Sequence, residues 1–286
     1  MGERTRIQLG RREDLGADCA NCFGLCCVAL AFAKSADFPF DKPAGDPCVN
    51  LDNSDACRIH PHLRDRGFKG CTVFDCFGAG QKVSRRTFEG RSWRDDPETR
   101  AAMFGTFPVV RRLHELLWYL DEAITLVEQA RDAAAWLDVF ERIRLLSDQS
   151  AEQLTGLDVD AEYDAARDLL VEASEIARSG IEPAKHVWRG RPLQPGSDLM
   201  GARMVGVDLR GVSLRGSTAI AADLTRASLW RCDVLGVDMR DADLSGADLY
   251  GAIFLTQMQV NSARGDDRTA LPDGFERPSH WSSRTP

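Results

Sequence analysis

The sequence has no long hydrophobic run. Its longest unbroken apolar stretch, residues 25–33, has nine residues, whereas a membrane-spanning helix needs about 20. The first residues, MGERTRIQLGRRED, carry charges with no apolar segment behind them, which is unlike a secretory signal peptide. We therefore expect a cytoplasmic protein that makes no contact with a membrane.

Basic charge is also scarce, because 36 basic residues stand against 44 acidic ones and give a net charge of −8. A balance of this sign argues against nucleic acid as a partner. With 43% hydrophobic and 28% charged residues over 286 positions, the composition excludes disorder, collagen and coiled coil and predicts a globular chain of two or three domains. No Ser-His-acid constellation and no glycine-rich cofactor loop is visible, so we assign no catalytic residue.

The middle of the chain predicts helices and no chemistry. Residues 101–185 carry eight basic and 17 acidic groups, and their apolar residues recur at the three and four spacing of a helical face. The runs are Val109, Leu113, Leu116, Leu117, Leu120, Ile124 and Val127, then Trp136, Leu137, Phe140, Ile143 and Leu146, then Ala165, Leu169, Leu170 and Ile176. We expect Pro108 in the first turn of the first helix, Asp132 as the N-cap of the second, and Gly180 at the end of the third.

The C-terminal third repeats every five residues. From residue 197 the chain can be written as SDLMG, ARMVG, VDLRG, VSLRG, STAIA, ADLTR, ASLWR, CDVLG, VDMRD, ADLSG, ADLYG and AIFLT. The third place is apolar in all twelve pentads, and the first place holds only Ser, Ala, Val or Cys. Neither the helical period nor the strand period gives a strict five, so this repeat predicts a solenoid.

These pentads resemble the pentapeptide repeat family, whose consensus A(D/N)LXX is nearly literal at residues 222–224, 242–244 and 247–249. The resemblance covers residues 197–256 and implies a right-handed quadrilateral β-helix with four pentads per coil, hence about three coils. Cys232 takes a first place of a pentad, so we interpret it as a small buried residue. Exposed ends of the solenoid need covers, and we expect Leu271, Phe275 and Trp281 to cover the far end and the helices, with Trp188, the near end.

The best-known members of the pentapeptide repeat family mimic DNA and inhibit topoisomerases, which implies a long acidic rod. Residues 186–286 carry equal numbers of acidic and basic groups. Five cations are expected to face outward, at Arg210, Arg215, Arg226, Arg231 and Arg240. Imitation of a phosphate backbone is therefore disfavoured, and we expect the β-helix surface to be a scaffold that contacts a protein partner.

The N-terminal segment concentrates the cysteines. Eight of the nine lie within 58 residues, at Cys19, Cys22, Cys26, Cys27, Cys48, Cys57, Cys71 and Cys76. In a reducing compartment, thiolates at such short spacing hold metal, since Cys-x2-Cys lets two sulfurs reach one tetrahedral ion. Adjacent side chains point apart in most backbones, so Cys26 and Cys27 are expected to serve two sites, or one site with a spare thiol.

The order of these cysteines resembles the zinc- or iron-chelating family defined by a CxxCxxCC signature, which also occurs in flagellin lysine methylases. The resemblance covers residues 19–81, through CANCFGLCC, PCVNL and ACRIHPHLRDRGFKGCTVFDCFGAGQ. It implies all eight cysteines as metal ligands. The spacing before Cys26 and between Cys71 and Cys76 departs from the family pattern.

Thiolate ligands suit zinc, iron and iron–sulfur clusters alike, so the spacing leaves the metal open. His60 and His62 are possible nitrogen ligands, with a solvated loop as the alternative. We thus predict a Cys-rich metal-binding domain over residues 15–95, an α-helical connector over residues 96–185, and the β-helix with its C-terminal cap over residues 186–286.

The function predicted for this multidomain chain is that of a metal-binding pentapeptide repeat protein acting as a scaffold, interaction or redox- and metal-responsive module. Two alternatives stay open. One is an iron–sulfur-dependent enzyme related to protein-methylating chemistry, and the other is a DNA-mimic inhibitor of gyrase.

Overall fold

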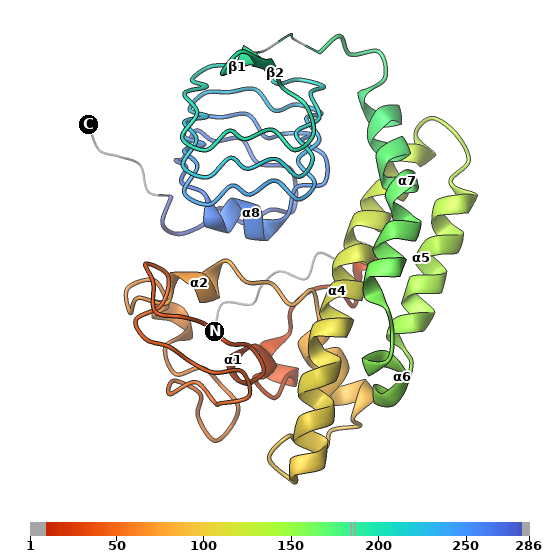
Figure 1. Ribbon diagram of the computed structural model, residues 1–286, viewed down its shortest axis with the longest axis vertical. Helices are drawn as coiled ribbons and strands as arrows, with labels where there is room; N and C mark the ends of the chain where they lie inside the picture. The colour runs from red at the N-terminus through yellow and green to blue at the C-terminus, as the bar shows by residue number, and fades with distance from the viewer. Residues whose placement is uncertain (1–9, 184, 186, 282–286) are drawn as a thin grey trace. The chain divides into compact units, whose positions relative to one another are not determined.

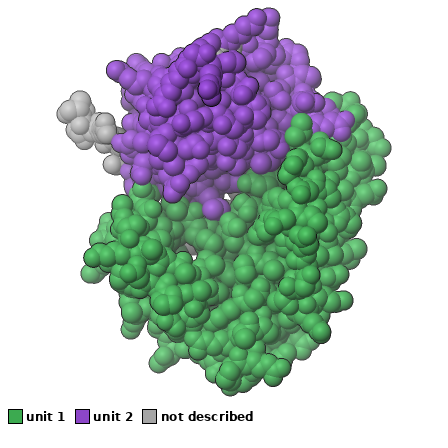
Figure 2. Space-filling model, in the orientation of Figure 1, with its two compact units in different colours: residues 1–171 green, residues 172–286 purple. Residues whose placement is uncertain are grey.

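The structure is a computed structural model that describes residues 10–183, 185 and 187–281. Figure 1 shows helices in the first part of the chain and a stack of coils in the last part. The chain divides into two compact units, residues 1–171 and residues 172–286 (Figure 2). None of the helices in the described part has the length and apolar character needed to cross a membrane.

The longest helix of the first unit is α4, Pro97–Glu128. It begins at Asp96, whose carboxylate accepts a hydrogen bond from the backbone N–H of Thr99 at 2.8 Å, with Pro97 as the first helical residue. The expectation that Pro108 lies in the first turn is wrong, because Pro108 lies inside α4. The cap at Asp96 satisfies an N–H that has no partner within the helix, so the helix starts a full eleven residues earlier.

Three further helices follow, α5 (Ala134–Ser147), α6 (Ala151–Thr155) and α7 (Val159–Arg178). The N-cap of α5 is Ala133 rather than the expected Asp132, although Asp132 still accepts a hydrogen bond from the N–H of Ala134 at 3.1 Å. Gly180, with φ of +76°, follows the end of α7 as expected. The indole of Trp136 donates to the carbonyl of Leu169 at 2.9 Å, which joins α5 to the first part of α7.

The cysteine-rich segment has little regular structure. Its helical turns are η1 (Gly10–Arg12), η2 (Cys19–Asn21), α1 (Leu25–Val28), η3 (His60–His62), α2 (Lys69–Thr72), α3 (Ala79–Gln81) and the π-helical η4 (Lys82–Thr87). Two antiparallel bridges, Phe32 with Lys42 and Leu51 with Cys57, tie its loops. Phe32 also stacks on Phe38 with ring centroids 4.2 Å apart, so aromatic packing holds a loop that lacks strands.

The second unit contains the coils of a β-helix (Figure 1). Parallel bridges join residues that are 20 positions apart, from Asp198 with Thr218 to Asp233 with Ile253. Twenty residues per coil are four pentads, so the predicted β-helix is confirmed. A pentad in the coils forms only a single-residue bridge before the chain turns, which is too short to count as a strand. Among the described residues, the regular strands are β1 (Val187–Trp188) and β2 (Arg191–Pro192).

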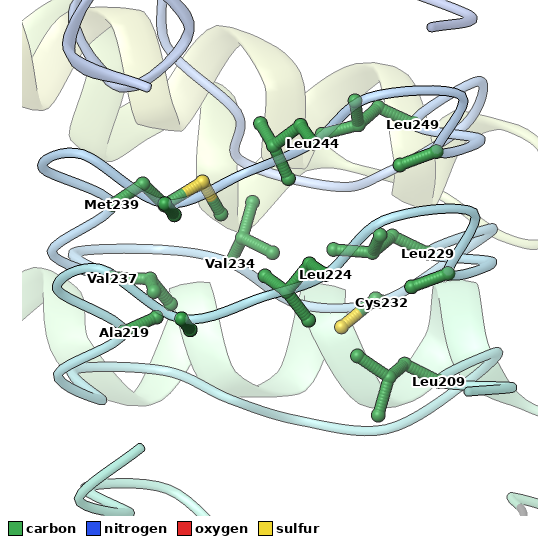
Figure 3. Packing of buried hydrophobic residues seen from close by; sticks show 14 of the residues in the cluster. Leu209, Ala219, Leu224, Leu229, Cys232, Val234, Val237, Met239, Leu244 and Leu249 are labelled. Carbon is green, nitrogen blue, oxygen red and sulfur yellow. The ribbon is translucent and has the colours of Figure 1, made fainter. Parts of the chain in front are cut away.

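The core of the β-helix follows the pentad pattern (Figure 3). All twelve residues at the third place are buried: Leu199, Met204, Leu209, Leu214, Ala219, Leu224, Leu229, Val234, Met239, Leu244, Leu249 and Phe254. Cys232 has no exposed surface, and burial raises the pKa of its thiol. A protonated, buried thiol at this place packs as a small apolar group.

Both ends of the β-helix are covered. At the far end, α8 (Gln257–Ser262) follows the last pentad, and Leu271, Phe275 and Trp281 pack against the core as predicted. At the near end Trp188 and Leu193 pack against the core. Within the second unit, the last turn of α7 contacts the coils, where Arg178 donates to the carbonyl of Gly211 at 3.2 Å. Cover of the near end by the other helices stays a prediction.

The arginines of the repeats do not all face solvent. Arg210 and Arg240 are exposed and form ion pairs with Asp208 and Asp238. Arg215, which was expected to face outward, instead pairs with the fully buried carboxylate of Asp233 at 3.0 Å. A buried acid needs a cation and hydrogen bonds to offset its lost hydration, and this requirement turns Arg215 inward.

Candidate functional site

The eight cysteines of residues 19–76 lie on loops and short helical turns of the first unit. Cys19 lies in η2, Cys26 and Cys27 lie in α1, and Cys71 lies in α2. The others occupy the connecting loops, with Cys22 after η2, Cys48 and Cys57 on either side of Leu51, and Cys76 before α3. All eight carry free thiols.

The fold brings these eight residues, which are far apart in sequence, into one region. Cys26 is within electrostatic range of Cys22, Cys57, Cys71 and Cys76, and it contacts Cys27 directly. Cys48 is within range of Cys57 and Cys71, and Cys19 is within range of Cys22 and Cys57. The eight thiols therefore form one connected cysteine cluster, which we define by these eight residues.

Cys26 and Cys27 are in direct contact within the cysteine cluster. Their Sγ atoms lie 3.9 Å apart, although adjacent side chains were expected to point apart. Both belong to the single helical turn α1, which lets the two sulfurs approach each other. Two thiolates on one tetrahedral ion, at bonds of about 2.3 Å, are about 3.8 Å apart, so this pair has the spacing that a shared ion needs.

Cys22 and Cys76 both lie close to Gly80. A Cβ atom on Gly80 would lie 2.7 Å from the Sγ of Cys22 and 3.8 Å from the Sγ of Cys76. The Sγ of Cys22 also accepts a hydrogen bond from the N–H of Leu25 at 3.5 Å and one from the hydroxyl of Ser84. The absence of a side chain at Gly80 therefore leaves space for the sulfurs of both Cys22 and Cys76.

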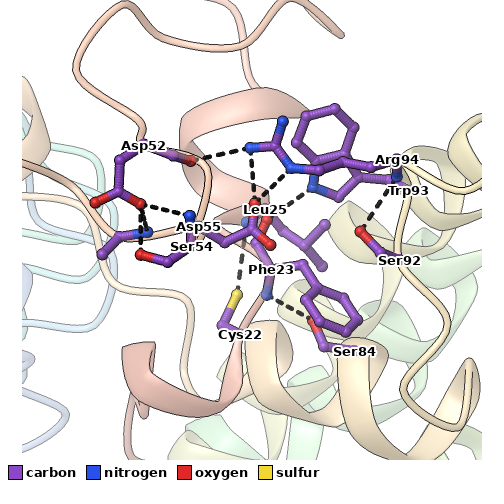
Figure 4. Close-up of polar contacts among 11 residues, drawn as sticks. Cys22, Phe23, Leu25, Asp52, Ser54, Asp55, Ser84, Ser92, Trp93 and Arg94 are labelled. Atoms are coloured by element: carbon purple, nitrogen blue, oxygen red, sulfur yellow. Dashed lines mark hydrogen bonds and ion pairs between the residues drawn. The ribbon is translucent and has the colours of Figure 1, made fainter.

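A polar framework fixes the loops around Cys22 (Figure 4). The indole of Trp93 donates to the carbonyl of Phe23 at 2.9 Å, and the N–H of Phe23 donates to the hydroxyl of Ser84 at 3.0 Å. Arg94 pairs with Asp55 at 2.9 Å and donates to the carbonyl of Asp52. Residues 84–94 thus hold both the loop of Cys22 and the loop that precedes Cys57.

Five thiols of the cysteine cluster have raised pKa values, which favours their protonated form. Burial raises the pKa of Cys22 to about 11 and the pKa values of Cys71 and Cys76 to about 12, and it also raises the pKa of Cys57. The pKa of Cys26 is raised first by its hydrogen bond with Cys27 and then by burial. A metal ion must therefore displace protons from these thiols in order to bind.

The described residues do not form a finished coordination shell. No three His, Cys, Asp or Glu side chains converge on one point where they could hold a metal ion in residues 10–183, 185 and 187–281. His60 and His62 lie in η3 and are exposed. The fold thus brings possible sulfur ligands into one region, and metal binding by these cysteines stays a prediction.

Sequence analysis missed three residues of this region. Lys42 is buried beside Cys48, Cys27 and Cys26, Ser84 donates to Cys22, and Gly80 lies close to Cys22 and Cys76. A loop lysine is normally exposed, so the sequence did not point to Lys42. For Gly80 and Ser84, the one sequence signal for a place near the cysteines was their position shortly after Cys76. The π-helical turn that carries Ser84 is a local geometry that is often found at functional sites.

A hollow in the first unit is lined in part by His114, for which sequence analysis found no chemistry. The cavity measures about 290 Å³ and is lined by residues that include Lys82, Asp148 and Phe140. The Nδ1 atom of His114 lies 2.6 Å from the carbonyl oxygen of Phe77. Burial lowers the pKa of His114 to about 4, so its ring is neutral at pH 7.

Known proteins resemble this chain in its repeats and in its whole length. The sequence pattern of the family described as Pentapeptide repeats matches residues 220–254 with eight copies. The uncharacterized protein YybG of Bacillus subtilis (strain 168) is 57% identical over 269 residues, which cover 94% of this chain and 95% of that protein.

A solved structure, a pentapeptide repeat protein from the thylakoid lumen of Arabidopsis thaliana, is 22% identical, with a TM-score of 0.19. The match covers 30% of this chain and 59% of that chain, so it spans less than two thirds of the length of the solved protein.

Proposed function

The chain belongs to the pentapeptide repeat family, and we propose that it is a metal-binding member of that family whose cysteine cluster holds zinc, iron or an iron–sulfur cluster. All eight residues, Cys19, Cys22, Cys26, Cys27, Cys48, Cys57, Cys71 and Cys76, serve as the ligand set. The β-helix serves as a contact surface. Because thiolate ligands must stay reduced, this proposal implies a reducing compartment such as the cytoplasm.

One observation carries the metal proposal. Cys26 contacts Cys27 and is within electrostatic range of Cys22, Cys57, Cys71 and Cys76. Thiols at this density are not needed for packing, because a cysteine packs like any small apolar side chain. A divalent cation stabilises several thiolates at once and offsets the cost of their burial.

The donor chemistry fits the proposed metals. Thiolate sulfur is the ligand that zinc, iron and iron–sulfur clusters share, and the 3.9 Å between the sulfurs of Cys26 and Cys27 matches two bonds to one ion. A bound zinc ion supplies a cross-link between loops, whereas a bound iron–sulfur cluster supplies electron transfer. The protein's part is to hold the loops through Trp93, Ser84 and Arg94.

Elemental analysis with a visible absorption spectrum tests the proposal on the full chain purified without oxygen. We expect metal bound to the chain, up to about two tetrahedral zinc ions, or iron with acid-labile sulfide and absorption near about 400 nm. Cys22→Ser should lower the metal content and destabilise the first unit. Cys232→Ser is the matched control, because Cys232 lies in the core of the β-helix.

Protein without metal under these conditions would contradict the proposal, and equal metal content in Cys22→Ser and the parent would remove Cys22 from the ligand set. The β-helix of Cys22→Ser should remain folded, since its core is built within residues 199–281.

The proposed contact surface lies on one face of the β-helix. Trp230 and Tyr250 are 37% and 55% exposed, and because they are 20 residues apart, they occupy equivalent places in successive coils. The ring of Trp230 lies against Gly251, where a Cβ would be 3.0 Å from its Cδ1 atom. Exposed aromatic side chains held in place by the backbone are typical of protein interfaces.

The contact surface is tested with a tagged full chain and a Trp230→Ala, Tyr250→Ala double variant expressed in the same cells. A protein that is captured by the parent and lost by the variant supports the proposal. Equal capture by both would contradict the role of this face. The variant is expected to fold, because both side chains lie on the surface.

A further inference from the structure

The cavity that His114 lines, which we call the His114 cavity, combines buried apolar surface with two buried polar side chains. Leu15, Leu117 and Phe140 supply the apolar surface, and each is buried. His114 and Lys82, which are 2% and 8% exposed, line the same cavity. Its volume of about 290 Å³ equals the space of about ten water molecules in the liquid. Apolar walls with a few polar groups are typical of sites for small molecules.

His114 presents a hydrogen-bond acceptor. Its Nδ1 atom lies 2.6 Å from the carbonyl oxygen of Phe77, which can only accept, so Nδ1 carries the ring proton and Nε2 carries a lone pair. No group in the described part of the chain donates to Nε2. A buried acceptor without a donor costs free energy, and a donor on a ligand in the cavity removes that cost.

Lys82 presents hydrogen-bond donors to the same cavity. Its ammonium has three N–H groups and pairs with Oδ1 of Asp148. Among the residues that the structure describes, the other two N–H groups find no acceptor. A lysine is rarely buried unless its charge is paired, and the carboxylate of Asp148 is 41% exposed. Lys82 can therefore take a second carboxylate, supplied by a ligand.

The charges of the His114 cavity are balanced, which restricts the class of ligand. Its lining holds equal numbers of acidic and basic residues. On exposed residues of this lining, Arg86 pairs with Asp14 at 3.2 Å and Arg144 pairs with Glu141 at 2.8 Å. A site for a polyanion such as a nucleotide needs an excess of cations. Balanced charges instead suit a ligand that carries one charge of each sign.

We propose that the His114 cavity binds an apolar α-amino acid as its zwitterion. The carboxylate of the ligand accepts from the ammonium of Lys82, the ammonium of the ligand donates to Nε2 of His114, and its side chain packs against Leu117 and Phe140. Leucine has about as many non-hydrogen atoms as the cavity has room for water molecules. The inference is independent of metal binding, because none of the eight cysteines of the cysteine cluster is among the lining residues.

The test is an NMR chemical-shift titration of the ¹⁵N-labelled full chain with L-leucine, which also measures weak binding. We expect a Kd of about 1 mM or below, with shifts centred on His114 and Lys82. Two analogues each remove one charge: leucinamide lacks the carboxylate, and 4-methylpentanoic acid lacks the ammonium. Each should bind about 10–100-fold more weakly than leucine, the usual effect of losing a hydrogen bond to a charged group.

Two variants assign the two charges of the ligand to their partners. Lys82→Met should weaken leucine binding by about 10–100-fold and leave leucinamide binding unchanged, because leucinamide has no carboxylate to lose. His114→Asn keeps an N–H for the carbonyl of Phe77 and removes the acceptor Nε2, so it should weaken leucine and not 4-methylpentanoic acid. Lys34→Met is the control, because Lys34 is an exposed lysine outside the cavity lining.

A parent chain that binds no L-leucine would overturn the inference. Inorganic phosphate that binds as tightly as leucine would also overturn it, because the cavity would then be a general anion site. Parent-like leucine binding by Lys82→Met, or an equal loss in Lys34→Met, would remove Lys82 from the site and contradict the proposal. If a variant does not fold, the two analogues decide on the parent chain: leucinamide that binds as tightly as leucine would overturn the inference.

Discussion

The hydroxyl of Ser174 donates a 2.7 Å hydrogen bond to the fully buried carboxylate of Asp233. The same Oδ2 atom accepts from Arg215 at 3.0 Å, while Arg178 donates to the hydroxyl of Ser174 at 3.0 Å. Within the second unit, this network attaches the last turns of α7 to the coils of the β-helix. A buried charge is tolerated because every one of its partners is a donor.

We expect Asp233→Asn to destabilise the second unit by about 3 kcal/mol, because it leaves Arg215 without its buried counter-ion. The asparagine oxygen can still accept from the N–H of Leu235, as Oδ1 of Asp233 does at 3.0 Å. The expected loss of stability therefore comes from the missing negative charge, because the hydrogen bond that holds the local turn is kept. Urea unfolding, followed by fluorescence, measures the change.

Asp238→Asn is the matched control for Asp233→Asn. Asp238 occupies the same place in the next pentad, accepts from the N–H of Arg240 and pairs with its side chain, but this pair is exposed. Exposed ion pairs contribute about 0–1 kcal/mol. Equal losses in the two variants would show that burial of Asp233 does not matter to stability.

The third places of the pentads supply most of the β-helix core. We expect Met239→Ala, which truncates a side chain that is 2% exposed, to cost about 2–5 kcal/mol. Met200→Ala is the control, because Met200 is 51% exposed at a fourth place, and surface substitutions cost about 0.5 kcal/mol or less. Thermal unfolding of the two variants compares them, and similar melting temperatures would contradict the inward assignment.

The β-helix was predictable because its rule is local. Five residues decide which side chain faces inward, and the same rule recurs twelve times, so Leu224 and Leu244 could be placed without knowing the rest of the fold. Arg215 broke the rule because its partner, Asp233, lies in the next coil. A contact between residues 18 positions apart is invisible to a pattern of five.

The cysteine cluster was predictable as a set of residues but not as an arrangement. Spacing identified all eight cysteines, whereas the approach of Cys22 to Cys76 depends on Gly80 and on loops held by Trp93. The burial of Lys42 depends on the carbonyls of Val28, Pro43 and Asp46, and backbone acceptors carry no sequence signal. The helix start at Asp96 was missed because Pro108 offered a competing signal.

Gly80→Ala tests the cysteine cluster without removing a thiol. The added methyl group would lie 2.7 Å from the Sγ of Cys22, which is too close, so the sulfur of Cys22 must move from its place. We expect the affinity for zinc to fall by about 10-fold or more, since ligand position is as important as ligand identity. A chelator competition assay on the full chain measures the affinity.

Gly16→Ala is the control for Gly80→Ala. Neither glycine has a positive φ, and a Cβ on Gly16 would meet no atom within 4 Å. Any loss of affinity in Gly80→Ala alone is therefore due to contact with Cys22. Parent-like zinc binding by Gly80→Ala would show that Cys22 and Cys76 do not act together.

His114 should make the stability of the first unit depend on pH. Burial is the main cause that lowers its pKa from 6.5 to about 4, and the charge of Lys82 lowers the pKa further. The hydrogen bond to Phe77 and the charges of Asp14 and Asp148 act in the opposite direction. Other charged groups line the same cavity: Arg11, Glu13, Arg86, Glu141 and Arg144. Because the unfolded chain binds the proton more readily than the folded one, acid favours unfolding.

The contribution of His114 to the free energy of unfolding is therefore complete above about pH 6.5 and is lost as the pH falls toward 4, a total of about 3 kcal/mol. We expect the stability difference between the parent and His114→Gln to shrink by that amount between pH 7 and pH 4 in urea unfolding. His62→Gln, which changes an exposed histidine, should track the parent over the whole range. A difference between the parent and His114→Gln that stays constant with pH would mean that His114 takes up its proton equally well in both states, and its burial would then have no effect on its ionisation.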